Sequence, residues 1–361
     1  MRKATLLGIC VLFVCVFVGP AVPGAAAPAN VLEVGTSSTC AYHTIADAIA
    51  AAQPGDTIKV QATTYSEPAL VVDKDLTLAG GYHTADPYGC LTITGVGYTT
   101  YQRAGTTAAP AIRVQNAALT MTWFIVELNA YGSGVQVVDG EATLANVIVR
   151  DNDATWGGGV RAVRSRVTLR NSEVSDNRAD FGGGLHAADG STVVAENTLI
   201  RANQGWELGA GVSLHTGSTF TGLDWTTIES NVTPFGCNYG GGIYAAGAGT
   251  EVLLDEARVV SNTALLRGGG IYLTDGAAAT LRNMARVGEN RAFGPASGAG
   301  GGVLVNGAGT VLVLDTAVIT ANWADPVGGG VASLGGTVHA VGAIVTENSA
   351  RSAGGGIYNE G

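Results

Sequence analysis

Four aspartates fall in two pairs about one repeat length apart, and they could form a metal site or part of a polysaccharide-cleaving site. Carboxylates of this kind can hold Ca²⁺ against the carboxylate of a uronic acid, while a basic group removes the neighbouring proton. Arg161 and His186 are the candidate basic residues for such catalysis. The competing interpretation is a hydrated corner, because Asp favours turns and Arg178 lies among the acids. The candidate metal ligands are Asp151, Asp153, Asp176 and Asp180.

These aspartates lie within a motif that occurs eight times between residues 149 and 357. Each copy has an aliphatic residue, two variable residues, Asn, and then a glycine cluster followed by Val, Leu or Ile. The first glycines of successive clusters are 25 to 32 residues apart, a period typical of solenoids, in which each repeat stacks on the next. The repeat asparagines are Asn152, Asn177, Asn203, Asn231, Asn262, Asn290, Asn322 and Asn348.

Each repeat divides into three short strands. In the stretch 159–177 the expected strands are Gly159–Val163, Arg166–Arg170 and Glu173–Asp176, with apolar side chains alternating along them. The many Gly and β-branched residues argue against helical hairpins. Three strands per coil, each paired with its counterpart one coil later, predict a parallel β-helix.

Two columns of residues predict where the coils turn. The repeat Asn is expected to point inward, where its amide can hydrogen-bond to the Asn of the next coil, and the following glycines permit a crowded corner. A second column, six or seven residues earlier, consists of residues that tolerate the left-handed region, which predicts a tight corner between the second and third strands. This column is Asn146, Asn171, Asn197, Asp224, Asp255, Asn283, Asp315 and Gly342.

The glycine cluster paired with aliphatic-x-x-Asn resembles the repeats of polymorphic outer-membrane proteins. The segments 40–49, 54–60 and 76–82 are similar to the opening of bacterial β-helix proteins with a pectate-lyase-like fold. The resemblance implies an all-β protein: a right-handed single-stranded parallel β-helix with three strands per coil and a short N-terminal capping helix. In enzymes of that fold, the substrate cleft lies beside the strand that follows the glycine cluster, so the resemblance indicates where to look for a site.

Residues expected to point outward from that strand form a column that runs from Arg161 and His186 towards the C-terminus. Tyr244 and Tyr272 fall in this column one coil apart, so their rings are expected to stack on the outside. Such a strip could bind a sugar or a partner protein. The alternative is that the stacked rings only stabilise the coils.

The N-terminal residues 1–29 have the features of a secretory signal peptide, with Arg2 and Lys3 before an apolar run and a Pro/Gly/Ala stretch. An uncleaved anchor is the alternative. Residues 30–82 are expected to form a capping helix at about 44–52 and the first coil, and residues 83–361 the remaining β-helix repeats. Because Gly361 directly follows the eighth glycine cluster and one strand, we expect further coils or an anchor beyond it.

Charge and cysteine content limit the partners. Without Arg2 and Lys3 the chain has 17 basic and 29 acidic residues, a net charge of −12, which argues against nucleic acid and anionic membranes as partners. No segment after the leader is long and apolar enough to span a membrane. In an oxidising compartment Cys40 and Cys90 could form a disulfide, which would leave Cys237 as a lone thiol.

Two functions are compatible with these features. The preferred one is an exported non-catalytic module, secreted or at the cell surface, that acts as a monomeric adhesin, passenger or structural element. Its partner would be a polysaccharide or a protein of the cell or host surface, and it would need no cofactor. The alternative is a carbohydrate-active enzyme, either a polysaccharide lyase or a glycoside hydrolase. The residues favour a Ca²⁺-dependent polysaccharide lyase that uses the four aspartates with Arg161.

Overall fold

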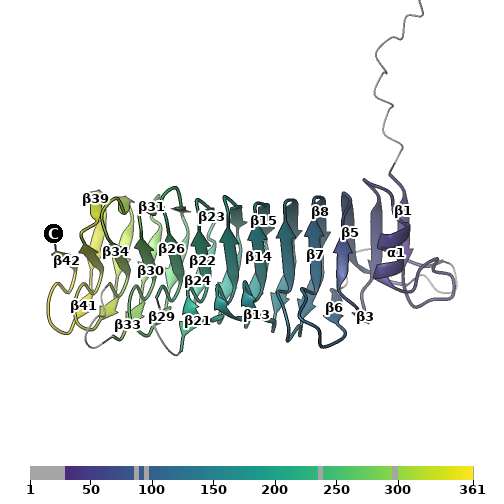
Figure 1. Ribbon diagram of the computed structural model, residues 1–361, viewed down its shortest axis with the longest axis horizontal. Coiled ribbons are helices and arrows are strands. Elements are labelled where there is room, and N and C mark those ends of the chain that lie inside the picture. The colour runs from purple at the N-terminus through teal and green to yellow at the C-terminus, as the bar shows by residue number, and fades with distance from the viewer. Residues whose placement is uncertain (1–28, 85–88, 93–96, 235–238, 295–299, 361) are drawn as a thin grey trace, which may run out of the picture.

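The computed structural model describes residues 29–84, 89–92, 97–234, 239–294 and 300–360. They form one elongated parallel β-helix, with coils stacked along its long axis and the single described helix at the N-terminal end (Figure 1). Every pairing between the named strands is parallel and joins one coil to the next. The predicted fold is therefore confirmed.

A regular coil visits four sheets in turn. The first sheet contains β1 (Val31–Val34), β2 (Thr57–Gln61), β5 (Leu76–Tyr82), β8 (Ala118–Thr122), β11 (Glu141–Ala145), β15 (Arg166–Arg170), β19 (Thr192–Glu196), β23 (Thr219–Leu223), β27 (Glu251–Asp255), β31 (Ala278–Arg282), β35 (Val311–Asp315) and β39 (Thr337–Val341). The second contains β4 (Leu70–Val72), β7 (Ile112–Gln115), β10 (Val135–Val138), β14 (Val160–Val163), β18 (Leu185–Ala188), β22 (Val212–His215), β26 (Ile243–Ala246), β30 (Ile271–Thr274), β34 (Val303–Asn306), β38 (Val331–Leu334) and β42 (Ile357–Glu360).

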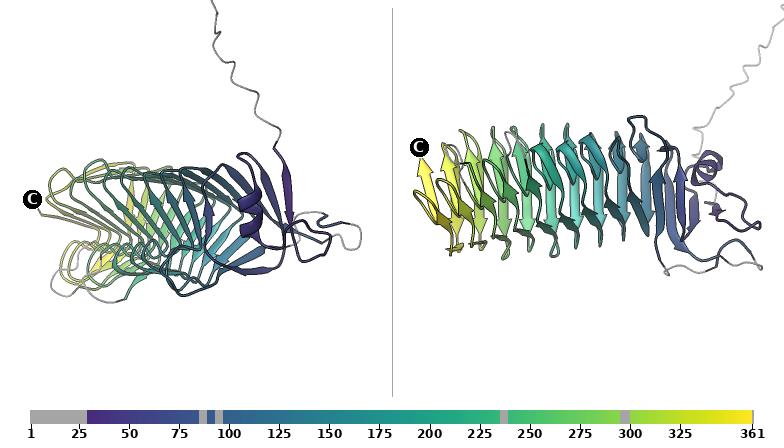
Figure 2. Two further views of the ribbon diagram at one scale, coloured as in Figure 1. Left: turned by 45° about the vertical axis from the view of Figure 1, so that its right-hand side comes forward. Right: turned by 90° about the horizontal axis from the view of Figure 1, so that it is seen from below.

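The third sheet follows the first along the chain and contains β3 (Thr64–Glu67), β6 (Thr99–Arg103), β9 (Phe124–Glu127), β12 (Ile148–Arg150), β16 (Glu173–Ser175), β20 (Leu199–Arg201), β24 (Thr227–Glu229), β28 (Arg258–Val260), β32 (Arg286–Gly288), β36 (Val318–Thr320) and β40 (Ile344–Thr346). The fourth contains β13 (Asp153–Trp156), β17 (Arg178–Phe181), β21 (Gln204–Leu208), β25 (Val232–Thr233), β29 (Thr263–Ala264), β33 (Arg291–Ala292), β37 (Trp323–Ala324) and β41 (Ser349–Ala350). Its strands lie along the lower side of the solenoid in Figure 1, and the right-hand view of Figure 2 looks at the molecule from that side.

The fourth sheet is the main departure from the three strands expected per coil. Its strands occupy the segment between the repeat Asn and the glycine cluster, in which no strand was expected. They are two to five residues long, and several present polar or aromatic side chains, so no apolar alternation identifies them. The three strands that were predicted for 159–177 lie within one residue of their observed bounds.

The interior is a continuous stack of apolar side chains from the first, second and third sheets, and the fourth sheet adds buried alanines outside this stack. Within one coil Ala162, Leu169, Val174 and Ala179 each have no exposed surface, and equivalent residues repeat from coil to coil. Burial at this scale is the main source of stability in such a solenoid, because each coil covers the apolar face of its neighbour.

The N-terminal end carries the predicted capping helix, α1 (Ile45–Ala51). Thr44 caps it by accepting a hydrogen bond from the Asp47 backbone N–H at 3.1 Å, and the helix contacts the first strands β1 to β4. A second acceptor, which the sequence analysis missed, is the buried Glu67 carboxylate, bonded to the N–H groups of Ile45 and Ala46 at 2.9 and 3.0 Å. These bonds satisfy donors at the helix N-terminus that have no partner within the helix.

Other N-terminal predictions have mixed outcomes. The Cys40–Cys90 disulfide is present, with the two sulfurs 2.02 Å apart. Cys237 and residues 1–28 of the predicted signal peptide lie outside the described residues. No helix in the described part of the chain is long and apolar enough to cross a membrane.

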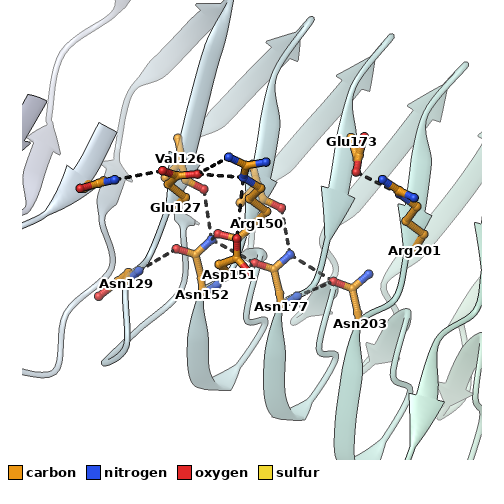
Figure 3. A network of polar contacts seen from close by, with 12 residues as sticks. Val126, Glu127, Asn129, Arg150, Asp151, Asn152, Glu173, Asn177, Arg201 and Asn203 are labelled. Carbon is orange, nitrogen blue, oxygen red and sulfur yellow. Dashed lines mark hydrogen bonds and ion pairs between the residues drawn. The ribbon is translucent and has the colours of Figure 1, made fainter. Parts of the chain in front are cut away.

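The repeat asparagines form the predicted ladder. Asn177 donates from Nδ2 to Val149 O at 2.9 Å and to Asn203 Oδ1 at 3.1 Å, while its backbone N–H donates to the same Oδ1 at 3.0 Å (Figure 3). Bonds of the same kind link every repeat Asn through Asn348. Asn129 adds one further member at the N-terminal side, where its N–H donates to Asn152 Oδ1.

The glycines after each Asn are required by two separate constraints. Gly182 has a φ of +66°, a left-handed conformation that L side chains rarely adopt. At Gly184 the φ is ordinary, but a Cβ would lie 2.6 Å from Gly211 O of the next coil and 2.8 Å from Asn203 Nδ2. The chain can therefore pass beside the ladder only where it has no side chain.

The second predicted column is confirmed at six of its eight positions. Asn146, Asn171, Asn197, Asp224, Asn283 and Gly342 have φ between 45° and 62°. The prediction is wrong at Asp255 and Asp315, which end strands β27 and β35. There the left-handed residue is the next one, Glu256 or Thr316, with φ of 55° or 57°.

Corner length explains both errors. Glu256 and Thr316 lie six residues before their repeat Asn, as do the left-handed residues of the other short corners. A spacing of seven is correct only where the corner has an extra residue, at Asp224–Thr226 and Asn283–Ala285. The sequence pattern could not separate a longer corner from a longer strand.

Replacing Asn203 by Asp tests the ladder. Aspartate lacks the amide donors to Val174 O and Asn231 Oδ1, and it places an acceptor or a charge at a site with no exposed surface. We expect Asn203→Asp to lower the free energy of unfolding by at least about 2 kcal/mol, measured from the urea midpoint.

The matched control is Asn197→Asp on the surface of the same coil. Asn197 is exposed, donates from its side chain to Asn171 Oδ1 alone, and has a φ of 45° that Asp also tolerates. We expect a change within about 0.5 kcal/mol. Equal losses in the two variants would mean that the ladder amides are not what holds the corners together.

Candidate functional site

The predicted acidic corner exists, but it is only part of the expected site. Asp151, Asp153 and Asp176 line a pocket of about 320 Å³ together with Arg178. Burial raises the pKa of Asp151, and the nearby Asp176 raises it further. Asp180 does not line the pocket, although its charge contributes to raising the pKa of Asp153, for which burial is again the larger cause.

The geometry of this corner favours the turn interpretation over a metal site. Among the described residues no three His, Cys, Asp or Glu side chains come together closely enough to hold a metal ion. Asp151 and Asp176 have φ of 55° and 57°, each directly before a ladder Asn, a position at which Asp is tolerated better than most residues. The four aspartates therefore do not form the single Ca²⁺-binding group that the sequence suggested.

Arg161 and His186 lie on another surface, contrary to the expectation that they adjoin the acids. They are register partners on β14 and β18, on the outer face of the second sheet. The glycine cluster turns the chain between the acidic corner and this sheet, so residues close in sequence face different sides. The charge that most affects Arg161, apart from its burial, comes from Asp189, not from the four aspartates.

Arg161 lines a groove between the second sheet and the fourth. Arg113, Gln136 and Arg161 are register partners on β7, β10 and β14 and form one wall. Tyr131 and Trp156 contribute aromatic surface to the same cavity, whose volume is about 330 Å³. None of the residues that line the groove is acidic. We call this cavity the arginine groove.

Both guanidinium groups of the arginine groove have unused hydrogen-bonding capacity. The Nε atoms of Arg113 and Arg161 are buried and have no hydrogen-bond partner. Burial lowers the pKa of Arg161, and the charge of Arg113 lowers it further, against an opposing effect of Asp189. Two guanidinium groups on either side of Gln136 are stabilised by an incoming anion, because it accepts hydrogen bonds from them and offsets their repulsion.

An aromatic stack borders the arginine groove towards the next coils. The rings of Trp156 and Phe181 stack with centroids 4.0 Å apart at 12°, and His186 meets Trp156 edge-on at 4.9 Å. His186 is 2% exposed and neither ring nitrogen has a hydrogen-bond partner. Burial, with smaller effects of His215 and Arg161, lowers its pKa to about 3, so the ring is neutral near pH 7.

Comparison with known proteins agrees with this architecture. A family model described as "Right handed beta helix region" matches residues 111–285. The solenoid is a right-handed parallel β-helix. No curated protein matches the chain.

Solved structures that are similar to this chain include three enzymes. A pectate lyase has 12% identity and a TM-score of 0.48, over 89% of this chain and 79% of its own. An alginate lyase from Paenibacillus has 14% identity and a TM-score of 0.42, over 92% and 98%. A pectin methylesterase from Aspergillus niger has 14% identity and a TM-score of 0.36, over 93% and 91%. At such identities the likeness concerns the fold alone.

The expected tyrosine strip is not an exposed surface of the β-helix. Tyr244 and Tyr272 do stack, with ring centroids 5.6 Å apart, but they are only 8% and 6% exposed. They belong to a second apolar cluster with Leu304 and Ala332, over which Tyr239 and other residues of the fourth-sheet side pack. The space between the second and fourth sheets is thus open near β7 to β14, where it forms the arginine groove. Further towards the C-terminus this apolar cluster fills it.

Sequence analysis missed Arg113, Gln136 and Trp156 as residues of one site. The signal was present, because the outward column that begins at Arg161 continues back to Gln136 and Arg113, one residue after the strand start in each coil. The coils before Asn152 lack the complete motif, so the sequence alone did not show that Gln136 and Arg113 belong to this outward column. The position of Trp156 depends on the fourth sheet, which was not predicted.

Because the imidazole of His186 is buried, we expect the stability of the protein to depend on pH. The folded-state pKa of the imidazole, about 3, is below the ordinary value of 6.5, so protonation favours the unfolded chain, and stability is lost as the pH falls from about 6.5 towards 3. We expect His186→Phe, which preserves an aromatic ring beside Trp156, to weaken this pH dependence by up to about 4 kcal/mol. Urea midpoints between pH 3.5 and 7.5 would measure it.

His339→Phe on the exposed face of β39 is the matched control for this experiment. It is expected to retain the pH dependence of the unsubstituted protein. A His186→Phe variant that lost stability on acidification as steeply as the parent would show that the buried imidazole is not responsible.

Proposed function

We propose that the protein binds an acidic polysaccharide in the arginine groove, with polyuronates as the substrate class. The observation that carries this proposal is the pair of guanidinium groups, Arg113 and Arg161, which flank Gln136 on one wall and have buried Nε donors without partners. Uronate carboxylates repeat along such a polymer and can accept bidentate bonds from Arg. Trp156 and Tyr131 offer apolar surface to the sugar rings between them.

The charge distribution favours attraction of a polyuronate to the arginine groove rather than to the whole surface. The full chain has a net charge of −10, which repels a polyanion from most of the surface. The arginine groove is lined by two arginines and no acid, so a chain of uronates would be held at this point of the solenoid. Affinity should decrease as salt is added, because part of the attraction is between accessible charges.

We also propose that binding takes place outside the cell. The leader-like residues 1–29 and the Cys40–Cys90 disulfide are consistent with export to an oxidising compartment, where such polymers are met. The protein would act as a monomer, secreted or at the cell surface.

Removing a groove guanidinium tests the binding function. We expect Arg161→Gln or Arg113→Gln to weaken binding of hexagalacturonate or hexaguluronate about tenfold or more, because each removes one or two charge-assisted hydrogen bonds. Isothermal titration calorimetry at two salt concentrations would measure the loss.

Arg166→Gln is the matched control, since Arg166 lies on the neighbouring strand β15 of the same coil, is exposed and does not line the groove. It should bind both hexasaccharides as the parent does. Equal losses in Arg161→Gln and Arg166→Gln would reduce the effect to general surface charge and contradict a specific groove.

A second candidate function is eliminative cleavage of the same polymer. The specific observation in its favour is that Arg161 and Arg113 flank Gln136 on one wall of the groove, so one can face the C5 proton while the other meets the carboxylate. Burial also lowers the pKa of Arg161, which is the direction that a general base needs. The base would take the proton from C5, beside the carboxylate, as the C4–O4 bond breaks. A C4–C5 double bond forms, and the departing oxygen takes a proton from water. Arg113 would neutralise the carboxylate while negative charge develops there.

Ultraviolet absorbance of unsaturated ends distinguishes binding from cleavage. If the groove cleaves, polygalacturonate or alginate incubated with the protein gains absorbance, and Arg161→Gln abolishes the gain. Asp176→Ala should leave the rate unchanged, because Asp176 lines the separate acidic corner. Loss of activity in Asp176→Ala would instead assign the chemistry to the acids, and no absorbance with any polyuronate would restrict the protein to binding.

A further inference from the structure

A second recess lies on a different part of the β-helix, at the corner between the first and third sheets. It has a volume of about 360 Å³ and spans coils that contain β24, β28, β32 and β36. Its lining includes Trp225, Met284, Arg258, Arg286, Glu256 and Val318, none of which lines the arginine groove. We call it the corner recess.

The corner recess exists because neighbouring corners differ in length. The corners Asp224–Thr226 and Asn283–Ala285 have three residues, while the corner between them, Glu256–Ala257, has two. The short corner therefore lies between two longer corners that protrude further from the solenoid. The extra residue of each long corner, Trp225 and Met284, lies on either side of the gap.

Both extra residues are unfavourable choices for a corner that has only a structural role. Trp225 and Met284 have φ of 66° and 63°, each directly after another left-handed residue. A bulky side chain in this region is strained, and glycine would fit without cost. The two side chains are also 60% and 61% exposed, among the largest exposures of apolar residues in the described chain. Strain and exposure together indicate a role in contacting something else.

Polar groups around the corner recess are balanced in charge. The guanidinium of Arg258 lies over the Trp225 ring at 5.0 Å and has no carboxylate within ion-pair distance among the described residues. Arg286, its register partner on β32, pairs with Glu289 at 2.7 Å. The Glu256 carboxylate also lines the recess. The recess thus offers a free donor group, a free acceptor group and apolar side chains on either side, without net positive charge.

We propose that the corner recess binds one sugar unit of a neutral glycan. The apolar face of a pyranose ring would pack on Trp225 and Met284, because its C–H groups carry partial positive charge that suits the ring face of an indole. Its hydroxyl groups both donate and accept, so they match Glu256 and Arg258 at the same time. An anionic sugar would meet Glu256 without a second free cation, and the arginine groove is the better match for it. The recess is therefore a site separate from the groove and for a different class of sugar.

Titration with neutral hexasaccharides tests this assignment. The probes are cellohexaose, mannohexaose and xylohexaose, followed by tryptophan fluorescence and calorimetry. We expect at least one to bind with a Kd on the order of 1 mM or tighter. Trp225→Gly should weaken that binding about tenfold, and Met284→Gly should also weaken it. Because glycine relieves the left-handed strain, both variants should keep or raise the thermal midpoint, so lost binding cannot be attributed to unfolding.

Trp206→Ala is the control, since Trp206 is an exposed tryptophan on β21 of the fourth sheet, outside the corner recess. It should bind the neutral probes as the parent does. Binding of no neutral probe in the millimolar range, or equal binding by Trp225→Gly and the parent, would overturn the proposal. Loss of hexagalacturonate binding in Trp225→Gly would assign an acidic occupant and overturn it as well. Arg161→Gln separates the two sites, because it should weaken only the acidic probe.

Discussion

The asparagine ladder is the interaction on which the rest of the β-helix depends. At the corner after the third sheet the backbone turns inward, so a carbonyl group in each coil and the N–H of each ladder residue face the interior rather than water. An unpaired group there would cost about 1–3 kcal/mol, in every coil. The amide of Asn satisfies both kinds of group and bonds to the amide above it, as between Asn177 and Asn203. Because it is both donor and acceptor, the same residue type can repeat along the whole column.

A fixed corner fixes the register of everything that follows it. The glycine cluster, which follows the ladder after one fourth-sheet strand, starts the second sheet at the same height in each coil, and residues such as Arg161 and His186 then become neighbours. The residues of an outer column can therefore differ from coil to coil while the backbone of the coils stays the same. Where the column contains Arg113, Gln136 and Arg161 the space beside it is an open polar groove, and where it contains Tyr244 and Tyr272 the same space is an apolar cluster. One fold supports both because the side chains outside the coil do not determine the stacking inside it.

Corner length is the second means by which this chain varies its surface. A two-residue corner needs one left-handed residue, whereas a three-residue corner needs two and displaces a side chain outward. Asp224 with Trp225 and Asn283 with Met284 show this, and the short corner at Glu256 between them creates the recess. The coil interior is unchanged, because the strands on either side of these corners keep their pairing. Additions at corners are tolerated for the same reason that loops generally tolerate insertion.

The sequence alone determined the parallel β-helix, the inward Asn column and the capping helix, because these depend on residue types that recur at a constant spacing or on local capping chemistry. It allowed the Cys40–Cys90 disulfide, which the fold confirms by bringing the two residues together. Tertiary structure alone decided which residues share a surface. The fourth sheet, short and without apolar alternation, covers the outer column, so His186, Tyr244 and Tyr272 are buried although the sequence placed them outside. The turn at the glycine cluster places Arg161 in the arginine groove and Asp151 and Asp176 in the acidic corner, although these residues are close in the sequence. Periodicity reports the stacking of coils, but the direction that a side chain faces after a corner depends on how many residues the corner contains, and only the folded backbone reveals that.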